Sequence, residues 1–260
     1  MTNVVHLSLP QFQNLIVILV RVAGILAVTP ILGSRSVPVH VKTGLVLVLS
    51  FVLLPFVQVA GLPGDPLLLG AGLSAEFLVG LVLGLGVRAV FVGIEVAGEV
   101  MGHQMGLGVV QLFDPTTSQQ IPLVGHFQTL VASLVFLSLN AHFIVVDAIA
   151  HSFEVVAPFS ARLSDAIVQD VVRISQGMFT VALKLAAPIM VTMLLINLAM
   201  AALGRTVPQL HVFILSFPLT IAAGLLVIGA ALPFTVGLYE AEFVGLGETV
   251  YGLMRMLGHG

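Results

Sequence analysis

The residues of this chain that could do chemistry are charged side chains that lie inside long apolar segments. Ionised groups are costly in hydrocarbon, so each of them needs a charged partner, a hydrogen-bonding partner or contact with water. One interpretation is a polar pathway or an ion-pair network between helices. The other is a set of charges that reach a membrane interface or face a neighbouring subunit. Five such residues are Arg21, Glu76, Arg88, Asp147 and Lys184.

Four residues between positions 88 and 103 follow one face of a predicted helix. Arg88, Glu95, Glu99 and His103 are separated by seven, four and four positions, which places them along a single stripe. The two carboxylates could form a general acid/base pair, but the neighbouring sequence supplies no nucleophile and no set of metal ligands. The pattern therefore favours a stripe that faces water or a partner protein.

No pattern of histidine, cysteine or serine indicates catalysis or a bound metal. The chain has eight histidines and no cysteine, which excludes thiolate ligands and a cysteine nucleophile. HExxH and GxSxG motifs are absent, and His142 does not share a helical face with Asp147 and His151. We expect no enzymatic activity, no cofactor and no metal site.

The elements that position these residues are long apolar helices. Of the 260 residues, 58% are hydrophobic and 8% are charged, whereas about a quarter of a soluble domain is charged. The net charge of -3 gives no basic field for nucleic acid. Continuous apolar runs of about 20 residues predict an all-α membrane protein rather than a barrel. About six long segments are expected, at residues 12–32, 43–60, 67–102, 123–149, 178–203 and 211–238.

Kinks and shorter helices are predicted in the second half of the chain. Pro188, Pro218 and Pro233 each remove an interior hydrogen bond, so the last two long segments are expected to be kinked. Residues 157–176 have an amphipathic pattern, which predicts a separate interfacial or packed helix. A short surface helix is expected in the tail, which carries Glu240, Glu242 and Glu248.

The positive charges do not indicate an orientation in a membrane. If all six segments span, three Lys or Arg residues lie on each side, and the chain has no Trp and only two Tyr to mark the interfaces. Either some segments do not span, or the helices pack on protein rather than on lipid. Arg205, between the last two segments, is therefore grouped with the polar residues that face a neighbouring subunit.

Glycines recur at four-residue spacing in the third segment. Gly80 and Gly84, and then Gly98, Gly102 and Gly106, place small residues on one face of a helix. Such spacing lets a second helix backbone approach closely. The chain has 26 glycines, and this regular spacing favours tight helix packing with Gly80, Gly84, Gly98 and Gly102 at the contacts.

Residues 104–122 form a long stretch without helical periodicity. Loops of this length in compact proteins are usually functional or disordered. The first half is rich in Met, Gly, Leu and Val, which suits an adaptable apolar seal, and the second half is rich in Thr, Ser and Gln. The composition favours a seal, and the alternative is a surface loop without a specific role.

Several short motifs follow one another along nearly the whole chain. They are an arginine in the first segment followed by Pro30, Val37-Pro38, Glu76 with Gly80 and Gly84, Ala97-Gly98, Phe113-Asp114-Pro115, Asn140-Ala141-His142, Ala187-Pro188 and Gly204-Arg205-Thr206-Val207-Pro208-Gln209. In this order and spacing the chain resembles the FliR family of flagellar export-gate proteins, called SctT in virulence type III secretion. Asn140-Ala141 departs from the family, which commonly has two glycines before the histidine.

The resemblance implies a structural component of the flagellar export gate rather than an enzyme. FliR-like proteins join FliP-like and FliQ-like subunits in a helical core around a pore for unfolded proteins. FlhB-like and FlhA-like export components, membrane lipid and a place in the flagellar basal body at the bacterial inner membrane are implied as well. By analogy, residues 1–175 correspond to a FliP-like part and residues 176–260 to a FliQ-like helix hairpin and tail, within one domain.

The resemblance also implies a plug for the pore at residues 104–122. In the family, a loop at this position blocks the closed pore, and we expect unfolded substrate to displace it. Energy would come from partner proteins and not from this chain. The residues expected to form the plug are Met105, Gly106, Leu107, Gly108, Val109, Val110, Gln111, Leu112, Phe113, Asp114 and Pro115.

Two alternatives to this function stay open. The first is the virulence homologue of the same family. The second is an ion-coupled secondary transporter, in which Arg21, Glu76, Arg88 and Asp147 would belong to an ion pathway between broken helices. Transporters often contain inverted repeats, and no repeat is detectable in this chain.

Overall fold

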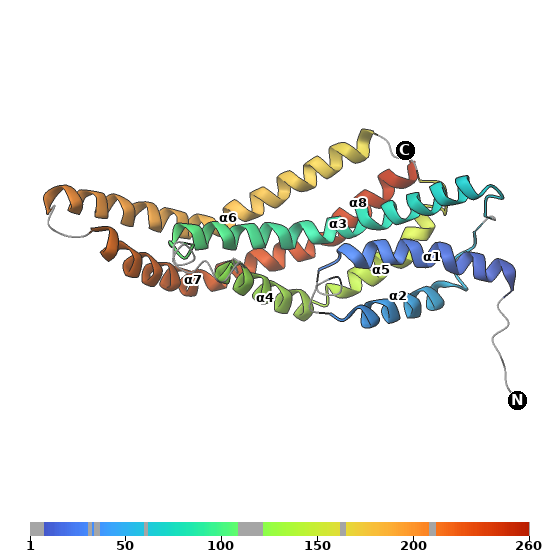
Figure 1. The fold of residues 1–260 in the computed structure, drawn as a ribbon, viewed down its shortest axis with the longest axis horizontal. Helices are drawn as coiled ribbons and strands as arrows, with labels where there is room; N and C mark the ends of the chain where they lie inside the picture. Colours follow the sequence, from blue (N-terminus) through green and yellow to red (C-terminus); the bar gives the residue numbers. More distant parts are fainter. Residues whose placement is uncertain are drawn as a thin grey trace, which may run out of the picture. The chain divides into compact units, whose positions relative to one another are not determined.

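The computed structural model describes residues 8–30, 33, 37–59, 62–108, 122–161, 165–207 and 212–259. All regular secondary structure in these ranges is helical (Figure 1). The predicted all-α fold class is therefore confirmed. The helices are α1 (Leu9–Val28), α2 (Val39–Leu53), α3 (Pro66–Gln104), α4 (Leu123–Ser138), α5 (His142–Val155), α6 (Asp165–Thr206), α7 (Val212–Val244) and α8 (Leu246–His259).

Fewer helices are long enough to cross a membrane than the sequence predicts. In the described part of the chain, four stretches have sufficient length and hydropathy, namely Leu9–Val28, Pro66–Gln104, Gln169–Thr206 and Leu215–Gly258. α4 and α5 add a fifth only if they form one broken span. α2 is apolar but has 15 residues, fewer than the roughly 20 that a span requires. The expected number of about six long helices is therefore too high.

The fourth predicted segment is interrupted where Asn140 adopts a left-handed conformation. α4 ends at Ser138 and α5 begins at His142, and Asn140 between them has φ of 55°. A helix cannot continue through such a residue, and Asn accepts this conformation more readily than most residues. The break falls within Asn140-Ala141, the one motif that departs from the family pattern.

Two helices extend further than the pattern of the sequence predicts. The amphipathic segment at 157–176 is not a separate helix, because most of it forms the first turns of the 42-residue α6. Glu240 and Glu242 lie in α7 rather than in a tail helix, and only Glu248 lies in α8. Helical hydrogen bonds are local, so a helix can continue where its exposed face changes from polar to apolar. The three prolines lie inside α6 and α7 as predicted.

The first of two compact units comprises residues 1–89, 140–174 and 244–260. It contains α1, α2, the first part of α3, α5, the start of α6, and α8. Figure 1 shows α1 beside the first part of α3, and α1 also contacts α2 while α5 contacts α8. The interior is apolar, with Val17, Ile18 and Val22 of α1 fully buried.

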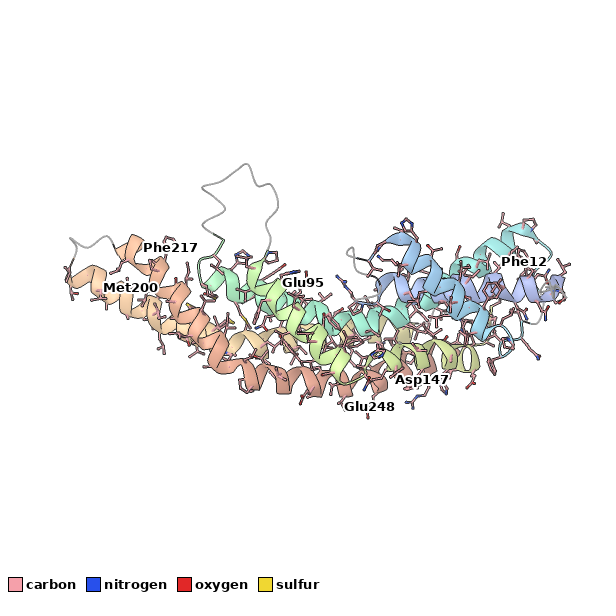
Figure 2. All side chains as sticks on the ribbon, turned by 90° about the horizontal axis from the view of Figure 1, so that it is seen from below. Phe12, Glu95, Asp147, Met200, Phe217 and Glu248 are labelled. Atoms are coloured by element: carbon pink, nitrogen blue, oxygen red, sulfur yellow. The ribbon has the colours of Figure 1, made fainter. Side chains whose placement is uncertain are left out.

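The second unit comprises residues 90–139 and 175–243. It contains the second part of α3, α4, most of α6 and most of α7, and Figures 1 and 2 show α6 and α7 side by side. Three aromatic rings join α3, α4 and α7, because Phe91, Phe136 and Phe243 have ring centroids 5.3 to 5.5 Å apart. Ile94 and Met193 are fully buried beside this core.

Large apolar side chains stay exposed along several helices. On α6, Leu194, Leu195 and Leu198 are each 58 to 61% exposed, and Leu226 of α7 is 74% exposed. A contiguous apolar surface of this kind is rare on a soluble monomer. Lipid or another protein must therefore cover these helices.

Candidate functional site

Arg21 and Glu76 form a fully buried ion pair in the first unit. Both side chains are 0% exposed, and Arg21 Nε donates a hydrogen bond to Glu76 Oε2 at 2.6 Å. Arg21 Nη2 lies 2.6 Å from the same oxygen and pairs with it by charge, without an aligned hydrogen bond. The guanidinium also lies 4.3 Å from the ring centroid of Phe153. The structure thus brings together two of the charged residues singled out from the sequence.

The same pair satisfies backbone groups at the end of α5. Arg21 Nη1 donates to the carbonyl oxygens of Ser152 and Val156, each at 2.8 Å, in the last turn and at the C-cap of that helix. Glu76 Oε1 accepts a hydrogen bond of 2.7 Å from the N–H of Phe159, whose φ is 64°. This left-handed conformation is unfavourable for an aromatic residue, so the carboxylate holds a strained turn. The charges therefore fix α1, α3 and α5 to one another.

Gly80 and Gly84 lie where α3 meets the backbone of α1. A Cβ at Gly80 would collide with the carbonyl oxygen of Arg21, and a Cβ at Gly84 would lie 2.6 Å from the carbonyl oxygen of Ile25. Because these neighbours are backbone atoms, no side-chain rotation can make room. Gly24, which sequence reasoning missed, is the matching position on α1, since its Cβ would lie 2.6 Å from the carbonyl oxygen of Phe77.

Gly98 and Gly102 lie on the second part of α3 and differ in their surroundings. A Cβ at Gly98 would collide with the Cα of Gly125 on α4, so two glycines face each other at this point. A Cβ at Gly102 would meet only the side chain of Val124 at 3.9 Å, which is ordinary contact. The packing of α3 on α4 therefore requires glycine at position 98 but not at position 102.

The other charged residues predicted to matter do not gather into one site. Among the described residues, no group of three or more His, Asp or Glu is arranged to hold a metal ion. Arg88 makes no ion pair with any described residue. The half-buried members of the predicted set are Arg88 and Glu95, and the exposed members are Glu99, Asp147, Lys184 and Arg205.

Asp147 belongs to a polar face that α5 and α8 share. Its carboxylate accepts a hydrogen bond from the Tyr251 hydroxyl and lies 3.1 Å from His151 Nδ1. Figure 2 shows Asp147 and Glu248 on the same side of these two helices. His151, Glu248, Tyr251 and Arg255 are among the residues that line a groove there. The four-residue spacing of Asp147 and His151 is visible in the sequence, whereas Tyr251 comes from a distant helix. Such a face requires water or a polar partner and is unsuited to hydrocarbon.

The predicted plug begins at the C-terminal end of α3, in the second unit. The helix ends in a Schellman motif, in which Leu107 N–H bonds to Gly102 O and Gly106 N–H bonds to His103 O, each at 3.1 Å. Gly106 has φ of 80°, the left-handed conformation that this motif requires. Met105 is fully buried, Gly106, Leu107 and Gly108 are half-buried, and positions 109–115 of the predicted plug lie outside the described residues.

Residues of α7 hold Met105, and sequence reasoning missed them. Thr220 Oγ1 lies 3.0 Å from the carbonyl oxygen of Met105, and a Cβ at Gly224 would lie 2.5 to 2.7 Å from three atoms of the Met105 side chain. A Cβ at Gly106 would lie 3.0 Å from the ring of Phe217. Phe217, Thr220 and Gly224 are spaced by three and four positions, which is the only sequence signal that they share a face.

A buried hydrogen-bond chain crosses the same unit. Tyr239, fully buried on α7, donates its hydroxyl to Gln128 Oε1 of α4 at 2.8 Å. Gln128 Nε2 in turn lies 3.6 Å from the sulfur of Met101 on α3. Sequence analysis did not predict either polar residue, because nothing along the chain pairs a residue of α4 with one of α7. These contacts connect α3, α4 and α7 within the second unit.

Removing the Tyr239 hydroxyl is expected to destabilise the protein. Tyr239→Phe leaves Gln128 Oε1 buried without its donor, which costs about 1–3 kcal/mol. Tyr251→Phe is the matched control, since it removes the only other tyrosine hydroxyl, from an exposed bond to Asp147. Thermal unfolding of the purified proteins in detergent measures the stability of both variants. If Tyr251→Phe lost as much stability as Tyr239→Phe, burial of the hydroxyl would not explain the destabilisation.

A known protein family matches nearly the whole chain. A family described as "Bacterial export proteins, family 1" matches residues 12–246. The match includes the whole second unit and the first unit apart from residues 1–11 and 247–260. It therefore contains the buried Arg21–Glu76 pair and the Met105 contact with α7. It ends at the first residue of α8.

Three curated relatives share one description. The chain is 33% identical over 243 residues to the flagellar biosynthetic protein FliR of Pectobacterium carotovorum subsp. carotovorum, covering 92% of this chain and 91% of the relative. It is 29% identical over 225 residues to FliR of Escherichia coli strain K12, covering 86% of each. It is 28% identical over 251 residues to FliR of Bacillus subtilis strain 168, covering 95% and 96%. These relatives span nearly the same length as this chain.

Proposed function

This chain belongs to the FliR family of bacterial export proteins, and from that premise we propose that it forms part of the pore wall of the flagellar export gate and carries the loop that closes the pore. It is a membrane-embedded component of the flagellar export apparatus. Its role in the proposal is structural and requires no catalytic residue. The exported unfolded flagellar subunits would pass beside it, and it would not modify them.

The exposed apolar helices support assembly with other membrane subunits. The exposed leucines of α6 and α7 need a partner or lipid, and the polar face of α5 and α8 needs water or protein. A chain that offers both kinds of surface fits a subunit of a ring around an aqueous pore better than a solitary span in lipid. We assign the neighbours to FliP-like and FliQ-like subunits, with FlhB-like and FlhA-like components beyond them at the inner membrane.

The internal correspondence to these partners is part of the same proposal. Residues 1–175 would take the place of a FliP-like subunit and residues 176–260 that of a FliQ-like hairpin. The long α6–α7 pair, which runs side by side, supports the second assignment (Figure 1). The remaining charged residues, including Glu99, Lys184 and Arg205, would face these neighbours, because they are exposed in the isolated chain.

The observation that carries the pore-closing role is the fixed starting point of the loop. α3 ends at Gln104, Met105 is buried against α7, and the backbone turns at Gly106. A loop that leaves such a point has a constant origin, whatever position its apolar residues take. An adaptable apolar segment on a fixed base suits a removable seal.

Replacing residues 109–115 with a Gly-Ser segment of equal length tests the closure. The replacement removes Val109, Val110, Leu112 and Phe113 but leaves Met105 and Gly106 unchanged. Cells that make the variant gate without export substrate are expected to take up small ions and dyes severalfold faster than cells with the wild-type gate. Flux of a small fluorescent anion is the measurement.

The matched control is the same kind of replacement in the turn at residues 62–64, which is expected to leave the membrane tight. A tight membrane with the 109–115 variant, in a gate of normal subunit composition, would refute the closing role. Native mass spectrometry of the co-expressed complex checks the composition. It is expected to find this chain together with two kinds of smaller membrane subunit, whereas a lone chain with substrate-dependent uptake would favour the transporter.

A further inference from the structure

The contact between Met105 and α7 defines a seat, formed by Phe217, Thr220 and Gly224, all within the second unit. These three residues lie on one face of α7, and Figure 2 shows Phe217 near the start of that helix. Met105 is 0% exposed and Thr220 is 6% exposed, so the seat excludes water. The seat lies 110 or more positions from Met105 in the sequence.

Two independent interactions hold Met105 in the seat. Its carbonyl oxygen, freed by the end of α3, lies 3.0 Å from the Thr220 hydroxyl, which also lies 3.1 Å from the carbonyl oxygen of Phe217. Its side chain occupies the space that a side chain at position 224 would need. A buried carbonyl without a donor and an empty space beside Gly224 would both be costly, so leaving the seat is unfavourable.

The turn that follows Met105 is also held in place. Gly106 lacks a Cβ and has φ of 80°, the left-handed conformation that the end of α3 requires. Its neighbour in the seat is the edge of the Phe217 ring, which a Cβ would approach to 3.0 Å. The hydrogen bonds from Gly106 N–H to His103 O and from Leu107 N–H to Gly102 O hold this turn on α3, so the fixed backbone extends from Met105 through Leu107.

We propose that Met105 is the fixed anchor of the gate loop and that Thr220 and Gly224 are the residues that position it. This inference rests on the proposed closing role of the loop. It assigns Met105 to the pore wall rather than to the plug. It also predicts that changes in α7 control how tightly a loop on a different helix seals the pore.

A disulfide between positions 105 and 224 tests whether the anchor stays in place. A Cβ at Gly224 would lie 2.5 Å from Met105 Cγ, so the two Cβ atoms are at most about 4 Å apart, within the range for a disulfide. The chain has no cysteine, so Met105→Cys/Gly224→Cys offers a single pair of thiols. Copper phenanthroline is the oxidant and dithiothreitol the reductant, and export of a flagellar subunit is compared in the two states.

The expected result is that the disulfide forms and that export continues at the rate of the reduced form. Loss of export in the oxidised state, reversed by dithiothreitol, would show that Met105 must leave the seat and would overturn the inference. Failure of the disulfide to form in a correctly assembled gate would also overturn it, since Met105 would then not occupy the seat.

A second pair of variants tests positioning without relying on export. Gly224→Ala places a methyl group where Met105 lies, and is expected to raise the resting dye flux severalfold. Gly229→Ala, five positions further along α7, meets nothing within 4 Å and is expected to leave the flux unchanged. Thr220→Val keeps the shape but removes the donor to Met105, and is expected to give a smaller rise.

The two proposals fail in different ways. If the 109–115 replacement leaks and Gly224→Ala does not, the anchor is wrong and the closing role survives. If neither variant leaks, the closing role itself is wrong, and the disulfide then reports only whether Met105 is seated. Equal flux in Gly224→Ala and Gly229→Ala, with a leaking loop replacement, would specifically reject positioning by α7.

Discussion

Replacing Arg21 with alanine is expected to destabilise the protein by about 3–5 kcal/mol, the usual cost of removing one partner of a buried ion pair. The variant leaves Glu76 as an uncompensated buried charge and removes the donor to Ser152 O and Val156 O. This is a large part of the roughly 5–15 kcal/mol that stabilises most domains. We expect little assembled protein in the membrane and a markedly lower unfolding temperature in detergent.

Two double variants separate the role of charge from the role of hydrogen bonding. Arg21→Glu/Glu76→Arg keeps the two opposite charges but exchanges donor and acceptor. A carboxylate at position 21 cannot donate to Ser152 O, and a guanidinium at position 76 cannot accept from Phe159 N–H. Arg21→Met/Glu76→Met removes both charges and leaves the same backbone groups unsatisfied. Neither variant is expected to restore the stability of the wild type.

Lys184→Ala is the control, because it removes an exposed positive charge from another helix and is expected to change stability little. Full recovery by the charge exchange would show that attraction between the charges, and not the backbone contacts, makes the pair necessary. Full recovery by the double methionine variant would show that an apolar core at this point is sufficient.

Adding one methyl group at Gly80 is expected to separate α1 from α3. The new Cβ would collide with the Arg21 carbonyl oxygen and lie 2.9 Å from the Ile25 nitrogen. Overpacking in a core costs about 1–3 kcal/mol, and we expect Gly80→Ala to lie at the upper end, because backbone atoms cannot rotate away. The unfolding temperature of the purified protein measures the loss.

Gly70→Ala provides a control of opposite sign on the same helix. A Cβ at Gly70 meets nothing within 4 Å, so the substitution adds helix propensity without a clash. A gain of about 0.5–1 kcal/mol is the usual result of Gly→Ala in a helix. Equal destabilisation at positions 70 and 80 would mean that glycine content, and not close approach to α1, matters in α3.

The two sets of variants are expected to be coupled. Gly80 lies one helical turn after Glu76 on α3, and the atom that its Cβ would meet belongs to Arg21. Any shift of α1 away from α3 therefore also lengthens the ion pair. The loss of stability in the double variant Gly80→Ala/Arg21→Ala is expected to be smaller than the sum of the losses in the two single variants, because each change disrupts the same contact.

The sequence by itself determined the class of the protein, the family and most of the helices. With 58% hydrophobic and 8% charged residues, the composition indicates a membrane protein, because so few charges cannot cover a soluble surface. The continuous apolar runs of about 20 residues indicate helices rather than a barrel. The order of short motifs, such as Gly204-Arg205 before Val207-Pro208, indicated the family that the comparisons support. Composition and short motifs are local features of the chain, so they can be recognised without knowledge of the tertiary structure.

The helix boundaries were predicted less well, for reasons that are also physical. The break at Asn140 depends on one residue with positive φ, which an apolar run conceals. α6 continues through a change from amphipathic to apolar sequence, because helical hydrogen bonds do not depend on which face is exposed. The count of spanning helices was too high because α2 is apolar but short.

Only the tertiary structure decided what each polar residue does. Arg21, Glu76 and Asp147 all read as charges in apolar segments, yet two of them form a buried anchor and the third lies on an exposed polar face with Tyr251. The partners of Met105 and of Gly80 are far away in the sequence, on α7 and α1. Periodicity shows which residues share a face of one helix, but only packing shows which face of which helix lies opposite.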